Sequence, residues 1–270
     1  MFDPIEITGK EYCMTDLFEN TPFYSRPYHV DRQFTDRKHN ILIDSGIYEE
    51  NGLKRFLTPC EIKKYFGTSA TYFDNQLAVD YIGISKRTGE VIFIQERNRN
   101  NTAKFSDYRD FTIRYRRKSE NGTVLEIPTE LLKMNKFIEQ IRSGELCISD
   151  ENLLNLKIDR KNPKFFLTYT FWNSDNTVAR YIIVNLTELL DLINSGKIVP
   201  VEAGQEHRNA KCGEFDEENG IFYAPVIQDF SHTEWFVGIN VQIIKPFVEA
   251  GLLHFYYGKS DFQNRDSWLN

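Results

Sequence analysis

Cysteine is scarce in this chain, and its few cysteines are far apart. The four are Cys13, Cys60, Cys147 and Cys212. None belongs to a CxxC pair, so we expect buried thiols rather than a disulfide framework. The five histidines are scattered and have no zinc-ligand spacing, so the pattern does not indicate a zinc site.

Long apolar runs are absent as well. The longest, such as YIIV at 181–184, are far too short to cross a bilayer. The first residues, MFDPIEITGKEY, lack a basic region followed by an apolar segment, which a secretory signal requires. We therefore predict a cytoplasmic protein with no membrane partner. GxGxxG, Walker, GxSxG and HExxH motifs are also missing. The sequence therefore does not indicate the enzyme classes that these motifs mark.

Charge is plentiful and unevenly distributed. The whole chain of 270 residues has a net charge of −6. Residues 97–118 alone carry +6, whereas residues 202–234 hold eight acidic side chains and only two basic ones. Such a basic segment in an acidic protein indicates a polyanion partner, although a solvated face is the usual role of a charge run.

The order of apolar and turn-forming residues predicts a mixed α/β chain. Proline at positions 22 and 27 favours irregular structure and short strands over the first 55 residues. Capping signals predict three helices: 58–67 with Thr58 as N-cap, 128–144, and 187–196 with Thr187 as N-cap. Strands are expected at 77–85, 91–97, 110–117 and 123–127, at 163–172 and 177–186, and in the last fifty residues.

No composition shift marks a domain boundary, so we predict a single domain over residues 1–270. Its core would span about 58–200, with elaborations at 1–57 and 221–270. The polar, acidic residues 200–220 are expected to form a loop.

The stretch LAVDYIGISKRTGEVIFIQERNRN, residues 77–100, reads as a β-hairpin that turns at KRTG. If the turn has an even number of residues, residue i pairs with residue 175 − i. Asp80 then lies opposite Gln95, and Arg97 shares their sheet face. An odd-length turn or a bulge would bring Glu96 to the side of Asp80 instead.

In these residues the chain resembles the PD-(D/E)XK nuclease superfamily, and most closely its Mrr-like restriction branch. There a strand aspartate is followed, in the next strand, by apolar residues and Q-x-K. Here VDYIG and EVIFIQER supply Asp80, Gln95 and Arg97 at those places. The resemblance covers about residues 75–120 and implies a restriction-endonuclease-like α/β (α+β) fold, with a mixed central β-sheet flanked by helices.

The resemblance also implies a function, a Mg²⁺- or Mn²⁺-dependent DNA endonuclease. The sequence leaves open whether the protein forms a homodimer. Asp80 would bind the metal, with Gln95 or Glu96 as the second ligand. Arg97 stands in place of the lysine, and since arginine keeps its proton it acts only as an electrostatic or positioning group. Further carboxylates could come from Glu61 or Asp74 upstream and from Glu126 or Glu130 downstream.

The basic segment would bind the nucleic acid. In DFTIRYRRK, apolar and basic residues alternate, which gives one apolar and one basic face. The expected contacts are Arg99, Lys104, Arg109, Arg114, Arg116, Arg117 and Lys118. Two other functions remain open from the sequence: a nucleic-acid-binding module with a degenerate nuclease fold, and a protein whose acidic segment binds a basic partner.

Overall fold

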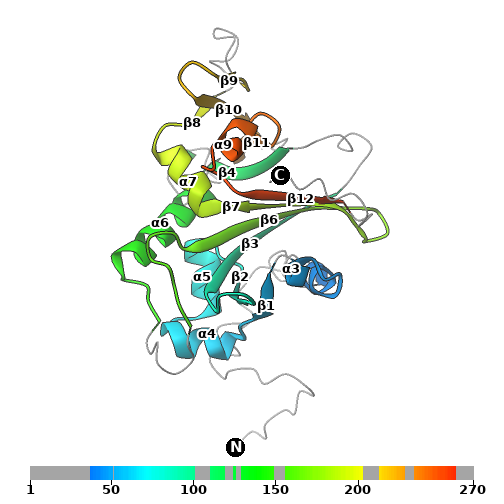
Figure 1. Cartoon of the computed structure of the whole chain (residues 1–270), viewed down its shortest axis with the longest axis vertical. Coiled ribbons are helices and arrows are strands. Elements are labelled where there is room, and N and C mark those ends of the chain that lie inside the picture. The colour runs from blue at the N-terminus through cyan, green and yellow to red at the C-terminus, as the bar shows by residue number, and fades with distance from the viewer. Residues whose placement is uncertain are drawn as a thin grey trace, which may run out of the picture.

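The chain forms two mixed β-sheets flanked by helices (Figure 1). The computed structural model describes residues 37–50, 52–100, 110–118, 124–125, 129–148, 156–202, 213–228 and 234–259. The mixed α/β class is therefore confirmed, but the expectation of one central sheet is wrong. No helix in this part of the chain is long and apolar enough to cross a membrane.

The first sheet has the strand order β1-β2-β3-β6-β7-β12. Its strands are β1 (Leu53–Phe56), β2 (Tyr81–Ser85), β3 (Val91–Asn100), β6 (Lys164–Trp172), β7 (Val178–Asn185) and β12 (Phe255–Lys259). Only β3 and β6 pair in parallel, which a long crossover connection allows. Both edge strands come from outside residues 58–200, because β1 precedes this range and β12 follows it.

The second sheet has the order β5-β4-β11-β10-β8, with β9 paired to β10. Its strands are β4 (Asp110–Lys118), β5 (Val124–Leu125), β8 (Ile198–Glu202), β9 (Phe215–Asp216), β10 (Ile221–Gln228) and β11 (Glu234–Asn240). The predicted hairpin of β4 and β5 is present. Residues 200–220 do not form one loop, since they include the end of β8 and all of β9.

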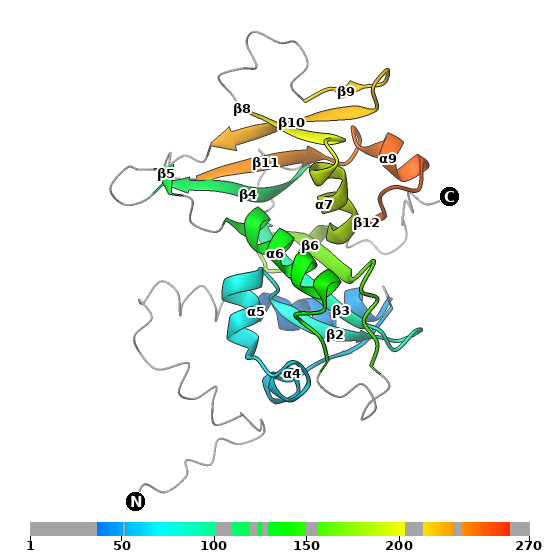
Figure 2. The ribbon, with the colours of Figure 1, turned by 90° about the vertical axis from the view of Figure 1, so that its left-hand side faces the viewer.

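The helices are α3 (Ile47–Glu50), α4 (Pro59–Phe66), α5 (Ala70–Leu77), α6 (Glu130–Ser143), α7 (Leu186–Asn194) and α9 (Lys245–Glu249). Of these, α6 and α7 lie between the two sheets (Figure 2). Phe137 of α6 packs edge-on between Phe93 and Phe165 of the first sheet, with ring centroids 4.7 and 4.8 Å apart. A second, smaller core lies on the opposite face of this sheet.

The local capping signals predicted two of the helices well. The Thr58 side chain and Glu61 form a capping box at the start of α4, and Gly67 ends that helix in the left-handed conformation. Thr129 is the N-cap of α6, and Gly144 ends it in the same way. Glycine is favoured at both C-caps because it has no side chain to clash at positive φ.

The N-cap of α7 differs from the prediction. It is Asn185, whose side-chain oxygen accepts hydrogen bonds from the backbone N–H groups of Thr187 and Glu188. Thr187 instead lies in the first turn, and its hydroxyl donates to the Pro163 carbonyl at 2.6 Å. We expect Asn185→Ala to lower the free energy of unfolding by about 1 kcal/mol. Urea denaturation measures this, and an unchanged midpoint would mean that α7 does not depend on this cap.

Three helical segments were missed. Residues 37–44 and α3 are helical, although irregular structure was expected there. The predicted strand 77–85 begins only at Tyr81, because Ser69 caps α5 and that helix runs to Leu77. Cys60 and Cys147 are half-buried rather than buried, and neither is in a disulfide in the described part of the chain.

Candidate active site

The β2–β3 hairpin has the predicted register. Tyr81 pairs with Ile94, and Ile84 pairs with Val91, so each pair of residue numbers adds up to 175. Asp80 lies one residue before β2, and its N–H donates to the Ile94 carbonyl at 2.9 Å. The turn therefore has the even length that brings Asp80 level with Gln95.

Gln95 and Glu96 leave opposite faces of the first sheet. Val91 and Phe93 of β3 pack in the main core between the sheets, and Gln95 and Arg97 follow them on that face by alternation. Ile92 and Ile94 pack in the second core, and Glu96 follows those. On β2 the alternation places Asp80 on the same face as Ile82 and Ile84, which belong to the main core.

The Asp80 carboxylate is held by the backbone of the neighbouring strand. Its Oδ2 accepts a hydrogen bond from the Glu96 N–H at 2.6 Å. Burial raises the pKa of Asp80 well above its ordinary value, and the nearby carboxylate of Asp74 on α5 raises it further. Arg97 and the hydrogen bond from Glu96 act in the opposite direction. The fold thus holds two half-buried acidic groups close together, where a proton or a cation stabilises them.

Arg97 is bound by Glu130, a residue of helix α6. Its guanidinium forms an ion pair with Glu130, with Nε 2.6 Å from Oε1. The other carboxylate oxygen of Glu130 accepts a hydrogen bond from the Arg114 backbone N–H at 3.0 Å. Glu130 therefore joins β3, β4 and α6 at one point, and it orients the Arg97 side chain.

Gln95 supplies an unused oxygen next to these charges. Its side chain is 3% exposed, and its Oε1 has no hydrogen-bond partner in the described part of the protein. Its amide nitrogen makes only a long contact of 3.5 Å with the Glu96 carbonyl. A buried amide oxygen without a partner is costly for a fold, so such an atom indicates a ligand.

Lys133 belongs to the same group of charges, although we did not predict it from the sequence. Its side chain is half-buried on α6, and burial lowers the pKa of its amine. Asp74 and Glu130 oppose that change, whereas Arg114 and Arg97 add to it. The spacing of three residues from Glu130 on a predicted helix was the signal that could have found it.

On the far face, Glu96 is held by two other side chains. Its Oε1 accepts hydrogen bonds from the Tyr48 hydroxyl and from His39 Nδ1, the latter at 2.6 Å. Asn98, which follows on the same face, accepts a hydrogen bond from the Trp172 indole at 2.7 Å. The alternative site with Glu96 beside Asp80 requires an odd-length turn, which the observed register excludes. Glu96 lies instead behind the candidate site and positions β3.

The other predicted acids are not all close to Asp80. Glu61 forms an ion pair with Arg55 at 2.7 Å, whereas Asp74 and Glu130 are part of the site. Glu126 lies outside the described residues. Within the described ranges, no three Cys, His, Asp or Glu side chains form a group that could hold a metal ion. A metal here would need Asp74, Asp80 and the Gln95 oxygen together, and these oxygen donors fit Mg²⁺ or Mn²⁺.

The basic segment is described only in part. Phe111 and Ile113 of β4 are buried, and Arg114 leaves the other face, so the predicted alternation holds up to Arg114. A register shift between Arg114 and Arg116 then interrupts it, because these two residues pair with the consecutive residues Phe236 and Trp235 of β11. Arg114 forms an ion pair with Glu234 at 3.0 Å, and Arg116 is exposed above the Tyr115 ring. Arg99 lies near the end of β3. Outside what the structure describes are Lys104 and Arg109, and the side chains of Arg117 and Lys118.

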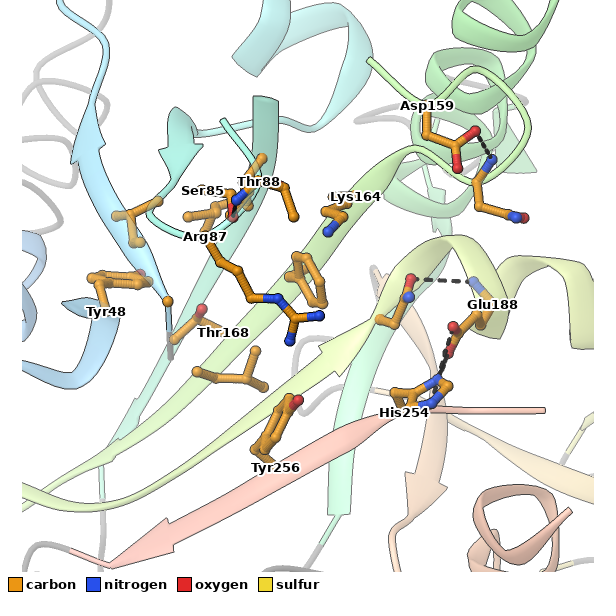
Figure 3. Close-up of a pocket in the computed structure, with 18 residues that line it drawn as sticks. Tyr48, Ser85, Arg87, Thr88, Asp159, Lys164, Thr168, Glu188, His254 and Tyr256 are labelled. Carbon is orange, nitrogen blue, oxygen red and sulfur yellow. Dashed lines mark hydrogen bonds and ion pairs between the residues drawn. The ribbon is translucent and has the colours of Figure 1, made fainter. Parts of the chain in front are cut away.

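A pocket of about 640 Å³ lies on the far face of the first sheet, away from Asp80 (Figure 3). Ile92, Ile94 and Ile183 are among its apolar lining. The Arg87 side chain extends over it, and His254 at its edge forms an ion pair with Glu188 at 2.9 Å. The lining includes none of the residues of the candidate site.

Comparison with protein-family models, with curated proteins and with solved structures finds no match for this chain. The candidate site is therefore defined by its geometry and by its short motif resemblance.

Proposed function

We propose that the protein is a metal-dependent nucleic-acid phosphodiesterase, a DNA endonuclease whose active site lies at Asp80, Gln95 and Arg97. One observation carries the proposal: the half-buried residues Asp74 and Asp80 lie near the Gln95 amide oxygen, which has no hydrogen-bond partner among the described residues, and next to a cation held in place by Glu130. Oxygen ligands beside a positioned cation are what phosphodiester hydrolysis requires.

The pair of aspartates supports a bound divalent cation. The Asp74 carboxylate lies close enough to Asp80 to raise its pKa, and a cation between the two would remove this repulsion. A divalent metal supplies positive charge and activates water for attack on phosphorus. Asp80 is suited to hold it, because the Glu96 N–H binds Oδ2 and no described residue forms a hydrogen bond to Oδ1, which can act as a ligand.

Arg97 would stabilise the negative charge that develops on the phosphoryl oxygens. Its ion pair with Glu130 limits its rotation, so the guanidinium is oriented before the substrate binds. Since arginine does not release its proton, this residue contributes charge and position but no proton transfer.

A second candidate function is nucleic-acid binding without cleavage. Two features of Arg97 favour it: this arginine stands where the resembling nucleases have lysine, and it is already bound to Glu130. Incubation of supercoiled plasmid with the protein in Mg²⁺, in Mn²⁺ and with a chelator separates the two. Metal-dependent nicking or linearisation supports the phosphodiesterase. DNA binding without a cut in either metal would overturn it in favour of the binding module.

The basic segment is proposed to contact phosphates, which makes its binding sensitive to salt. We expect the double variant Arg116→Ala with Arg117→Ala to reduce the slope of log affinity against log salt by about 0.9 for each lost contact. Fluorescence anisotropy with a labelled duplex measures this slope. Arg87→Ala, at the pocket on the far face of the first sheet, is the matched control and should leave it unchanged. Equal slopes for all three proteins would show that these arginines do not meet phosphate.

A further inference from the structure

Lys133 lies on the face of α6 that is turned toward the candidate site. It follows Glu130 by three residues, and residues with this spacing are neighbours on a helix surface. Glu130 is itself anchored to Arg97 and to the backbone of Arg114. The charges that act on Lys133 include Asp74, Arg114, Glu130 and Arg97, three of which belong to the site. Figure 2 shows α5, which carries Asp74, beside α6.

The surroundings of Lys133 favour loss of its proton. Burial has the largest effect and lowers the pKa of the amine; Arg114 and Arg97 add to this, whereas Asp74 and Glu130 oppose it without reversing it. Lys133 also stands near the N-terminus of a helix of 14 residues, where the helix dipole is positive and disfavours a cation. These conditions make the ammonium group a better acid than an exposed lysine.

Phosphodiester hydrolysis needs a proton donor, because the leaving alkoxide is a strong base. Arg97 cannot supply this proton. The Tyr169 hydroxyl is a nearby alternative, but Tyr169 is buried and its closest partner is Thr112 at 3.4 Å. Lys133 is partly exposed, carries a transferable proton and interacts electrostatically with Asp74, Glu130 and Arg97 of the site.

We propose that Lys133 is the general acid of the site, an inference that rests on the proposed phosphodiesterase function. The attacking water forms the new O–P bond and loses a proton to the solvent. The bond from phosphorus to the leaving oxygen breaks, and its electron pair stays on that oxygen. Lys133 Nζ gives its proton to the oxygen, which leaves as an alcohol, and the neutral amine takes a proton back from water.

The test uses an oligonucleotide duplex with a bridging sulfur at the mapped cut position, in place of the leaving oxygen. A thiolate leaves without a proton because its conjugate acid is far stronger than an alcohol. We expect Lys133→Met to slow cleavage of the normal linkage by about 100-fold or more, but to slow cleavage of the sulfur linkage only a few-fold. Mn²⁺ is used for both linkages because it accepts sulfur ligands better than Mg²⁺ does.

Three further variants complete the experiment. Lys133→Arg should be as slow as Lys133→Met on the normal linkage, because a guanidinium does not release its proton. Lys136→Met, an exposed lysine of the same helix, should cleave both linkages at the wild-type rate. Circular dichroism confirms that each variant is folded. Tyr169→Phe tests the competing donor, and a loss rescued by sulfur in that variant alone would overturn the assignment to Lys133.

Two other outcomes separate this inference from the function on which it rests. An equal loss on both linkages in Lys133→Met would mean that Lys133 only positions charge, so the inference fails while the phosphodiesterase stands. If the wild-type protein cuts neither linkage in Mn²⁺ or Mg²⁺, the proposed function and the inference fail together.

Discussion

Asp80→Asn is expected to abolish metal-dependent cleavage, with a loss of about 1,000-fold or more, within the range known for essential catalytic groups. The asparagine oxygen can still accept the hydrogen bond from the Glu96 N–H, so the local structure should be kept. What is lost is the charge that would bind the metal. A plasmid cleavage assay measures the activity, and DNA affinity without metal should stay the same or rise, because a negative charge near the phosphate has been removed.

The same substitution should stabilise the metal-free protein. The pKa of Asp80 is raised in the fold by burial and by Asp74, so the folded protein binds this proton more tightly than the unfolded chain does. Stability from this group is present at low pH and is lost as the pH rises through the folded pKa. Asp80→Asn should therefore raise the melting temperature more at pH 8 than at pH 5. Mg²⁺ should raise the melting temperature of the wild type but not of the variant.

Asp44→Asn is the matched control, because Asp44 is exposed in the helical segment 37–44. It should change neither cleavage nor the response to Mg²⁺. A wild-type rate for Asp80→Asn would exclude Asp80 as a metal ligand. A melting temperature that is lower at pH 8 than that of the wild type would show that the Asp80 charge is stabilised by the fold.

Arg97→Ala is expected to nearly abolish cleavage and also to destabilise the protein. The Glu130 side chain is only 4% exposed, so its carboxylate would lose its partner in a buried place. Breaking a buried pair costs about 3–5 kcal/mol, and because Arg97 is partly exposed we expect a loss of about 2–3 kcal/mol. Arg97→Lys should retain cleavage, because it keeps the positive charge.

A double variant separates these two effects. Adding Glu130→Gln to Arg97→Ala removes the uncompensated charge, so it should restore part of the free energy of unfolding without restoring cleavage. Urea denaturation and the plasmid assay measure the two quantities on the same preparations. Glu139→Gln, an exposed acid of the same helix, is the control. Recovery of cleavage in the double variant would mean that Arg97 acts only by neutralising Glu130.

The parts of this protein that were predictable are those set by neighbours in the sequence. The KRTG turn determined the pairing of β2 with β3, and the alternation of side chains then placed Asp80 with Gln95 and Arg97. Thr58 and Gly67 marked the ends of α4 for the same reason, because caps act within one helical turn. The start of α7 shows the limit of such signals. Asn185 and Thr187 can each cap a helix, and packing decides that Asn185 is the N-cap.

The rest of the candidate site depends on contacts between distant segments. Asp74 belongs to a helix that the apolar pattern did not reveal. Glu130 binds Arg97, and Lys133 lies within the range of their charges, because α6 packs beside α5 and β4. The role of Glu96 behind the site depends on His39 and Tyr48, which lie in a part of the chain that was expected to be irregular. No local sequence pattern predicts these contacts. They follow from burying the apolar faces of two sheets against the same helices, which brings charged groups together only once the whole core has formed.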